Sequence, residues 1–511
     1  MSSPQRRGID RFTLTSDLAP GVKQLILRSL LPTGLIFAVL TLSLAVSHSS
    51  GAVGFAFMGI GTYIVLSLWA RYGIGLPLLP VIAIQHLFTY ALPIAVQNET
   101  VLAYSDATLL HGSIEVLVFL LALGGGWRFG MQVFSPSPPM AYSLYILAEE
   151  GSAGLRRIGY GLIGVTSICY LLQALGLLNL VIDFLPSGSE SVVNALVSGA
   201  GMCGFFVIAL GIGSGEIPLY RTGLFWGLFL FDCLVSASAL LLSAPTSFVA
   251  TVAIGLFWGS ERIPWKFLTV VVAILGFLNL GKYEMRERYW DPLVDYTNTL
   301  PLSQIPARYA EWADTSLTVI SSGENSAIKD QKKKKDNSIL ARVNNLQNLL
   351  YVMDAVETDH IPLLLGSTYT LIPPLLIPRI LWPDKPRTHE GQVMLNVHFG
   401  RQDLISSYRT YIAWGLLPEA YGNFGSFWGS IVLGVVLGGF IAWVENASAN
   451  KPVLSMEGFL VFTLFLNMAA SFEMVASVLI TSIFQSLIPV VIACMPFVYR
   501  NYVRRPEPDA S

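Results

Sequence analysis

A cluster of basic residues follows an apolar, proline-interrupted segment in the last third of the chain. Its members are Arg379, Lys385 and Arg387. A guanidinium group offers a rigid fork of donors that matches two phosphate oxygens, so this cluster favours binding of a diphosphate. The alternative role for Arg379 is an interfacial anchor, whose apolar stem lies in lipid while its charged head reaches water.

The segment in front of this cluster, Leu371–Trp382, is strongly apolar but contains several prolines. Proline removes a backbone donor and breaks helices, so a continuous membrane-spanning helix is excluded here. Irregular backbone at membrane depth is tolerated where it is buried in protein or lines a wet cavity. The segment therefore predicts a broken hairpin that dips into the outer leaflet and carries the basic cluster at the lipid–water boundary.

Four further arginines could add phosphate contacts at the same boundary: Arg286, Arg288, Arg401 and Arg409. Arg286 and Arg288 directly follow an apolar segment, but acidic residues flank them. Local ion pairing is therefore an equal alternative for these two.

Transfer of a group to a hydroxyl also needs a carboxylate or imidazole beside that hydroxyl, worth on the order of 10²–10⁴ in rate. The candidates are Glu419, which precedes the turn-like run Tyr421–Gly425, and His389 with its neighbour Glu390. The alternative for Glu419 is an acidic residue at a helix start, which the helix dipole favours.

Several titratable residues lie inside apolar runs: His86, His111, Glu115, Asp232 and Glu473. Such groups are costly in lipid, which makes each a candidate for function. Polar pairing between helices is the alternative. Because they are scattered over separate spans, their spacing predicts no particular pair.

The elements that must position these residues are membrane helices. Hydrophobic residues make up 53% of the chain and charged residues 13%, whereas soluble domains have about 25% charged residues. The net charge of −2 leaves no basic excess for nucleic-acid phosphates, so nucleic acid is excluded as a partner. At about 20 apolar residues per span, the sequence predicts an all-α integral membrane protein with about twelve transmembrane helices. The predicted spans are Ser29–Val46, Gly51–Ala70, Leu76–Val96, Ala107–Trp127, Ile158–Leu178, Ser191–Gly213, Gly223–Leu242, Pro245–Gly259, Trp265–Gly281, Phe427–Val444, Gly458–Met474 and Leu479–Val498.

Lys and Arg are concentrated in alternate short connections and in both terminal tails. Because cytoplasmic loops carry the excess of Lys and Arg, this pattern puts both termini in the cytoplasm. The predicted organisation is a cytoplasmic tail (1–28), nine spans (29–281), one large extracytoplasmic loop (282–425), three spans (427–498) and a second cytoplasmic tail (499–511).

The large loop contains a very polar run at residues 321–336, with four consecutive lysines at Lys332–Lys335. A segment with so little apolar surface predicts a solvated linker; binding of acidic lipid or an anionic polymer is the alternative. Two helices are expected around it, over Ala307–Ile320 and over Ile339–Val356 with Ser338 as cap. The second has one apolar stripe, which predicts docking on the helix bundle or on the membrane surface.

Signals for other chemistry are missing from the sequence. The glycine runs lack the Gly-Lys-Ser/Thr ending of a phosphate loop, and no metal-ligand spacing occurs. The four cysteines lie in apolar runs as small core residues. We therefore expect no metal, nucleotide or other cofactor.

The region from about Arg342 to Gly439 resembles the O-antigen polymerase family, also called oligosaccharide repeat-unit polymerases. The residues that carry the resemblance are Leu365–Tyr369, Ile377–Arg379, Trp382–Pro386 and Pro418–Gly425, followed by a glycine-rich span. The Lys-rich insert departs from the family pattern.

The resemblance implies a polytopic glycosyltransferase of the bacterial inner membrane, which joins undecaprenyl-pyrophosphate-linked oligosaccharide repeats at the outer face into a cell-surface polysaccharide. Its implied partners are the lipid-linked oligosaccharide, membrane lipids and other polysaccharide-assembly proteins. Carried over to this chain, the phosphate clamp falls on Arg379, Lys385 and Arg387, and the acidic position on Glu419. The alternatives are a ligase-like glycan transferase, and a transporter or flippase of lipid-linked sugars; against the transporter, no internal repeat is found in the sequence.

Overall fold

The computed structural model describes most of the chain. The described residues are 18–46, 51–135, 140–144, 152–178, 189–240, 242–260, 262–289, 300–321, 344–378, 381–382, 384–409, 412–449, 451–469, 471–495 and 498–502.

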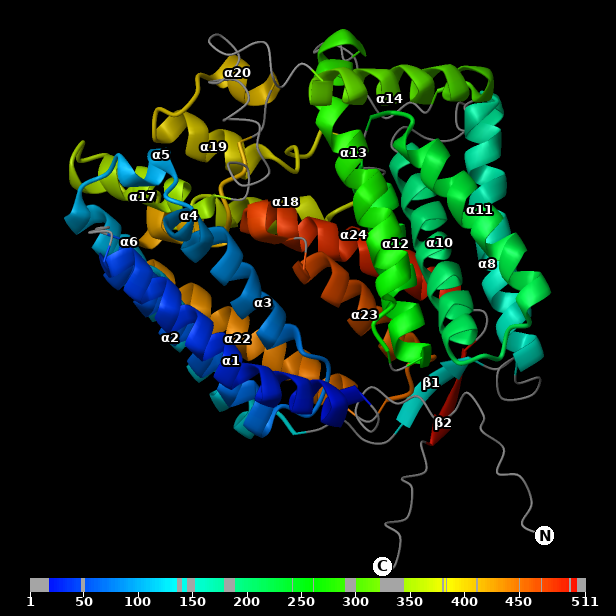
Figure 1. Ribbon diagram of the computed structural model, residues 1–511, viewed down its shortest axis with the longest axis horizontal. Helices are drawn as coiled ribbons and strands as arrows, with labels where there is room; N and C mark the ends of the chain where they lie inside the picture. Colours follow the sequence, from blue (N-terminus) through cyan, green and yellow to red (C-terminus); the bar gives the residue numbers. More distant parts are fainter. Residues whose placement is uncertain are drawn as a thin grey trace, which may run out of the picture.

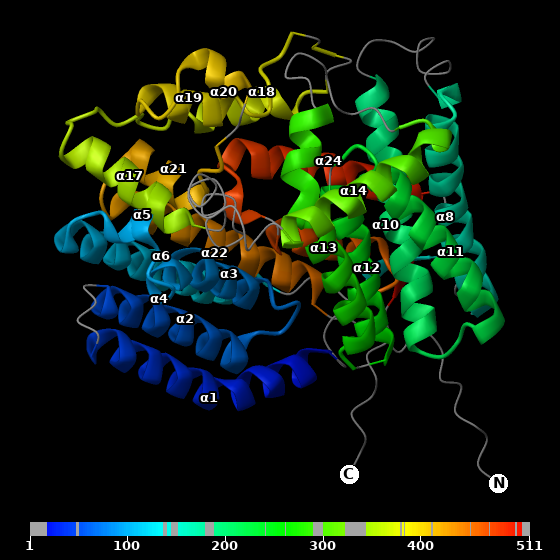
Figure 2. The ribbon, with the colours of Figure 1, turned by 45° about the horizontal axis from the view of Figure 1, so that its top comes forward.

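Two helical bundles lie side by side (Figures 1 and 2). The first contains α1 (Leu18–Val46), α2 (Ala52–Tyr72), α3 (Leu78–His86), α6 (Asp106–Val133) and α22 (Trp428–Ser448). The second contains α8 (Ser152–Ala174), α10 (Ser189–Gly213), α11 (Leu219–Ala237), α12 (Ser243–Ser260) and α13 (Trp265–Tyr289). Helices α23 (Met456–Ala469) and α24 (Ala476–Cys494) lie between the two bundles. The chain thus returns to the first bundle with α22 after completing the second.

Glycines allow α6 and α22 to pack backbone against backbone. A Cβ on Gly438 would lie 2.2 Å from the Leu123 carbonyl oxygen, and a Cβ on Gly126 would lie 2.6 Å from that of Val435. Small residues at a spacing of four are typical of close helix pairs in membranes, where van der Waals packing drives association. This contact fixes the ends of α6 and α22 relative to each other, which positions the residues discussed below.

One end of the molecule carries short helices that cover the bundles, and we call it the cap end (Figure 1). The cap consists of α14 (Ile305–Ser321), α17 (Asn345–Glu357), α18 (Ile372–Leu376), α19 (Glu390–His398), α20 (Leu404–Arg409) and α21 (Leu416–Phe424). At the opposite end, which we call the strand end, β1 (Met140–Leu144) pairs antiparallel with β2 (Val498–Tyr502). The remaining short elements are η2 (Leu87–Ala91), α4 (Leu92–Ala95), α5 (Glu99–Leu102), η3 (Leu302–Gln304), η5 (Tyr369–Leu371) and η6 (Ser471–Glu473).

Seven helices of the described ranges are long and apolar enough to cross a membrane: Lys23–Val46, Ala52–Tyr72, Leu78–Ala95, Asp106–Val133, Val193–Gly213, Trp265–Lys282 and Trp428–Ser448. Three shorter apolar helices are Pro245–Ser260, Met456–Ala469 and Ala476–Ile492. Large apolar side chains are exposed along these helices, for example Leu31, Val39 and Val272. A predominantly helical, multi-pass membrane protein is therefore confirmed, whereas the count of twelve spans stays a prediction.

Some element boundaries differ from those expected. Helix α1 begins at Leu18, so it includes part of the predicted tail, and the strand pair was not predicted. Helix α17 begins at Asn345, because the Asn344 side chain accepts a hydrogen bond from the Gln347 N–H at 3.0 Å and caps the helix there. The predicted cap Ser338 and the polar run 322–336 lie outside the described residues.

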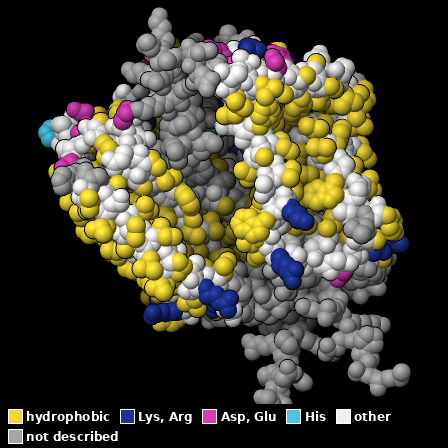
Figure 3. Space-filling view, viewed as in Figure 1, with side chains coloured by type: hydrophobic (Ala, Val, Ile, Leu, Met, Phe, Trp, Pro, Cys, Tyr) yellow, Lys and Arg dark blue, Asp and Glu magenta, His cyan; other side chains and the backbone are white. Residues whose placement is uncertain are grey.

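Charged residues are unevenly distributed on the face seen in Figure 3. Lys and Arg gather toward the strand end, while Asp and Glu gather mainly at the cap end, with a broad apolar surface between them. This separation matches the alternation of charge in the sequence.

Candidate functional site

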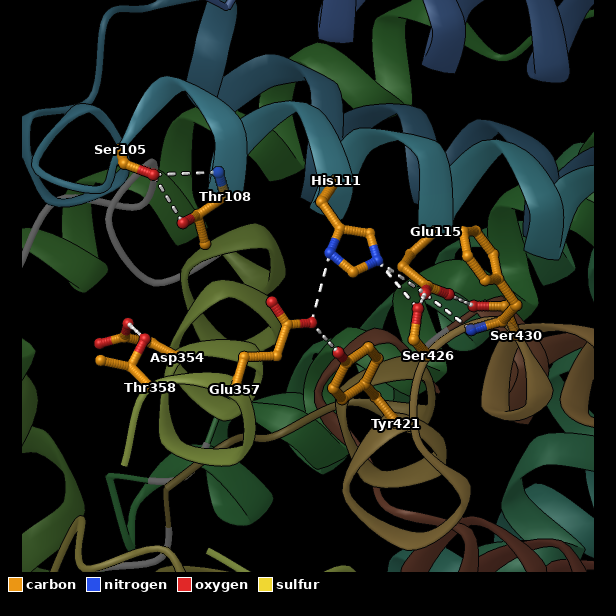
Figure 4. Close-up of polar contacts among 11 residues, drawn as sticks. Ser105, Thr108, His111, Glu115, Asp354, Glu357, Thr358, Tyr421, Ser426 and Ser430 are labelled. Atoms are coloured by element: carbon orange, nitrogen blue, oxygen red, sulfur yellow. Dashed lines mark hydrogen bonds and ion pairs between the residues drawn. The ribbon is translucent and has the colours of Figure 1, made fainter. Parts of the chain in front are cut away.

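The cap end of α6 carries two titratable side chains one helical turn apart, His111 and Glu115 (Figure 4). Their spacing of four residues puts both on the same face of the helix. The imidazole Nε2 lies 3.4 Å from the Glu115 carboxylate. Both residues belong to the predicted span Ala107–Trp127, so the expectation that the intramembrane candidates are scattered over separate spans is wrong for this pair.

Glu115 is fully buried and accepts hydrogen bonds from the start of α22. Its Oε1 accepts from the Ser426 hydroxyl and from the Phe427 N–H, each at 2.8 Å, and its Oε2 accepts from the Ser430 hydroxyl. These donors occupy the helix N-terminus, where backbone N–H groups lack partners within the helix and a negative charge is favoured. Phe427 adopts a φ of 57°, which bulky residues rarely adopt, so this connection is held under local strain.

His111 bridges the membrane helices to the cap. Its Nε2 lies 2.9 Å from the Ser426 hydroxyl, and its Nδ1 lies 3.3 Å from Oε1 of Glu357. The same Glu357 oxygen accepts a hydrogen bond from the Tyr421 hydroxyl of α21. Four elements therefore meet in one polar network: α6, α17, α21 and the start of α22 (Figure 4).

Helix α17 holds Glu357 in place through an apolar face. Leu346, Leu350 and Met353 of this face are completely buried. The buried Asn348 side chain donates to the backbone carbonyls of Ala413 and Trp414, which ties α17 to the residues just before α21. Of the two placements predicted for this amphipathic helix, the burial of its apolar face agrees with docking on the rest of the protein.

The network is closed at one end and open at the other. Glu115 has no exposed side-chain surface, while the side chains of His111 and Glu357 are 27% and 43% exposed. The second oxygen of Glu357 points away from both His111 and Tyr421 (Figure 4). A carboxylate backed by an imidazole, with one free oxygen at a solvent boundary, can take up or deliver a proton.

Glu419, a predicted catalytic base, is fully buried one helical turn from the start of α21. Its Oε2 accepts a hydrogen bond at 2.6 Å from the N–H of Ala476, which is the first residue of α24. Burial raises the pKa of Glu419 to about 7, against the opposing effects of the Ala476 N–H and Thr368. Glu419 lies in the first turn of α21 and accepts from the first N–H of α24. This position agrees with its alternative role, an acidic residue at a helix start.

Lys385 is also buried, and its ammonium group donates to backbone carbonyls of the proline-rich segment. The acceptors are Leu375 O at 2.7 Å and Ile377 O at 2.5 Å, at the end of α18. Lysine near a helix C-terminus stabilises carbonyls that have no partner within the helix. The structure thus places Lys385 where it holds the segment that leads to Arg379, which itself lies outside the described residues.

Two other predicted phosphate ligands contact aromatic rings. The Arg401 guanidinium lies 5.1 Å from the Tyr351 ring centroid and 5.3 Å from that of Trp414, and donates to the Asn348 side chain at 2.7 Å. Burial lowers the pKa of Arg401 from its usual value. Arg387 is exposed and lies 5.0 Å from the Tyr408 ring centroid.

The remaining predicted residues are dispersed over the cap end. Arg286 donates to the Leu240 carbonyl through Nε at 3.1 Å and Nη2 at 2.8 Å. Arg288 pairs with Glu311 of α14 at 3.2 Å, so ion pairing occurs, though with a residue more distant in sequence than expected. His389 contacts the Gln392 side chain at 2.6 Å, and Arg409 ends α20.

The structure therefore brings together His111 and Glu115, from the intramembrane candidates, with the motif Pro418–Gly425. Sequence reasoning missed Glu357, Ser426 and Ser430, because contacts across four elements leave no local signal. No group of three or more His, Cys, Asp and Glu side chains suited to a metal occurs among the residues described.

Comparison with models of protein families, with curated proteins and with solved structures finds no match for this chain.

Proposed function

We propose that this chain is a membrane glycosyltransferase that polymerises oligosaccharide repeats carried on undecaprenyl pyrophosphate, at the outer face of the bacterial inner membrane. One observation carries the proposal. The motif Pro418–Gly425, which resembles that of the O-antigen polymerases, folds into α21 and places Tyr421 on Glu357, beside His111. Two independent sequence signals, the motif and the costly intramembrane imidazole–carboxylate pair, thus lead to one partly exposed site.

The distribution of charge supports an outward-facing cap. Lys and Arg gather toward the strand end of the face in Figure 3, and the excess of Lys and Arg is a property of cytoplasmic ends. In this orientation the His111–Glu357 pair lies at the outer ends of α6 and α22. Both chain termini are then cytoplasmic.

In the proposed reaction, the hydroxyl of one sugar attacks the anomeric carbon of a second, lipid-linked repeat. The bond from that carbon to the pyrophosphate oxygen breaks, and the pyrophosphate leaves with the bonding electrons. The free oxygen of Glu357 takes the proton of the attacking hydroxyl. General-base assistance of this kind contributes on the order of 10²–10⁴ in rate.

Cations near the leaving group would stabilise the charge that develops on it. Arg387 is exposed beside Tyr408, and Arg379 follows the segment that Lys385 holds, so these two arginines are the proposed diphosphate ligands. We assign structural roles to Arg286 and Arg401, because their guanidinium groups already contact a backbone carbonyl and an aromatic ring, respectively.

The test is deletion of the gene in its host, followed by analysis of lipid-linked sugars. The proposal predicts that single lipid-linked repeats accumulate on the outer leaflet and that long polymer disappears. Repeats trapped on the cytoplasmic leaflet would indicate a transporter instead, and complete polymer retained on the lipid would indicate a ligase. Reintroduction of the Glu357→Gln variant is expected to leave the deletion phenotype in place at normal protein level.

A further inference from the structure

The polar contacts drawn in Figure 4 constrain which atoms of the network can carry protons. The starting point is Glu115, which accepts from the Ser426 hydroxyl, the Phe427 N–H and the Ser430 hydroxyl. A hydroxyl group has a single proton to donate. Because Ser426 gives its proton to Glu115, the Ser426 oxygen faces His111 as an acceptor.

His111 Nε2 lies 2.9 Å from that oxygen and must therefore carry a proton. In a neutral imidazole one nitrogen is a donor and the other an acceptor, so Nδ1 would then be bare. Nδ1, however, lies 3.3 Å from Oε1 of Glu357, which already accepts a hydrogen bond from Tyr421. A bare nitrogen and an ionised carboxylate oxygen would repel each other at this distance.

We infer that Glu115 is a positioning residue: acting through Ser426, it holds His111 with Nε2 protonated, so that Nδ1 and Glu357 share one further proton at the exposed end of the network. The two carboxylates differ in how deeply they are buried. Glu115 is enclosed and acts only as an acceptor, while Glu357 is 43% exposed and can exchange the shared proton with a ligand hydroxyl.

The groups that face His111 come from its own helix and from the three elements packed against it. They are Glu115 on its own helix, Glu357 from α17, Tyr421 from α21 and Ser426 before α22. Phe427 lies against the ring, with centroids 5.7 Å apart. Burial, and then the contact with Glu357, raises the pKa of Tyr421, so this phenol stays a donor to Glu357 across the physiological range.

The use of this proton in glycosyl transfer rests on the proposed function, but its location does not. The test is nitrogen NMR of the full-length protein in lipid nanodiscs, labelled with ¹⁵N at its six histidines. Subtraction of the spectrum of a His111→Gln variant isolates the signals of His111. The inference predicts a protonated Nε2, and an Nδ1 signal that is protonated or exchanging with a proton.

Variants distinguish this arrangement of protons on His111 from a purely structural role of the network. Ser426→Ala removes the nearer acceptor and leaves Nε2 only the Glu115 oxygen 3.4 Å away, so the preference for a protonated Nε2 is expected to weaken, whereas Ser426→Thr keeps the hydroxyl and the full preference. Glu115→Gln offers Ser426 a donor, which frees its proton for His111 and shifts the ring toward the Nδ1–H form. Glu357→Gln leaves His111 neutral, with Nε2 protonated and Nδ1 bare. The matched control Glu311→Gln, in the ion pair with Arg288, leaves the His111 signals unchanged.

A wild-type His111 with a bare Nε2, or a tautomer that does not respond to Glu115→Gln, would overturn the inference. The failure of the proposed function gives a different result. In that case the NMR pattern holds, while the Glu357→Gln variant still restores long polymer in the deletion strain.

Discussion

The cap ends of the two bundles handle buried polar groups in different ways. At the second bundle two of these groups end on backbone carbonyls: Arg286 of α13 donates to Leu240 O, and the indole N–H of Trp312, on the cap helix α14, donates to Leu278 O at 2.7 Å. In the first bundle the polar chain runs from buried Glu115 to the partly exposed His111 and Glu357. Carbonyls that are satisfied in place stabilise a fold, whereas titratable groups at a solvent boundary can exchange protons. A polar network that ends on partly exposed titratable groups is therefore a candidate site, whereas one that ends on backbone carbonyls is a structural contact.

The largest effect is expected for Glu357, the partly exposed carboxylate of the cap over the first bundle. Glu357→Gln is expected to slow polymer formation by about 10²-fold or more, because an amide cannot accept the proton of the attacking hydroxyl. Glu311→Gln is the matched change in the cap over the second bundle; it affects a partly exposed ion pair with Arg288 and a hydrogen bond from Tyr289, and should leave the rate almost unchanged. The measurement is conversion of lipid-linked repeats into polymer by purified protein in vesicles. Equal rates for the two variants would contradict a special role of Glu357 in polymer formation.

A fully enclosed carboxylate should act on stability rather than on rate, and Glu419 tests this. Its pKa is raised to about 7 in the folded protein, so the folded state binds more protons than the unfolded state between about pH 4.5 and pH 7. The contribution of Glu419 to stability is therefore complete below this window and falls by up to about 3 kcal/mol as pH rises through it. Glu419→Gln cannot ionise, and its carbonyl can still accept from the Ala476 N–H.

The measurement is the unfolding free energy of both proteins in detergent from pH 5 to pH 8. The Gln variant should lose the part of the pH dependence that is due to Glu419 and should be at least as stable as the wild type at pH 8. Glu419→Ala should be less stable at every pH, because the Ala476 N–H is left buried without its acceptor. An unchanged pH dependence in the Gln variant would contradict the burial of an ionisable Glu419.

A smaller effect on stability is expected for the structural arginine of the second bundle. Arg286→Met removes two hydrogen bonds to the Leu240 carbonyl, and hydrogen bonds from charged groups contribute about 1.5–3 kcal/mol. The variant should unfold at a lower temperature but keep its rate of polymer formation per folded molecule. A loss of rate without a loss of stability would instead restore Arg286 as a phosphate ligand.

The smallest effect is expected for removal of the very polar run at residues 321–336, which contains Lys332–Lys335. A solvated linker makes no packed contacts, so its deletion should change neither protein level nor polymer length. Gel analysis of polymer from cells that carry the deletion is the measurement. Loss of polymer with the protein still in the membrane would indicate that the lysines bind an anionic ligand.

Most membrane helices could be predicted because their signal is local. An apolar run of spanning length identifies the helix without knowledge of its contacts. Helix α14 was expected over Ala307–Ile320 because Pro306 suits an early helix position, also a local signal, and the helix occupies Ile305–Ser321. The site was predicted only in part. His111 and Glu115 stand out by their cost in lipid, but Glu357 looks like an ordinary surface acid until α17 docks on α6. Conversely, Lys385 stands out as a cation in the sequence, and only the fold shows that carbonyls of its own segment engage it.

The most direct test of the account is the accessibility of position 357 in intact cells. A Glu357→Cys variant would be made in a chain whose four native cysteines are replaced by serine. The account predicts that an impermeant maleimide added outside the inner membrane modifies Cys at this position, and that lipid-linked oligosaccharide repeats slow the modification. Modification only from the cytoplasmic side, or at a rate that the lipid-linked repeats do not change, would contradict it.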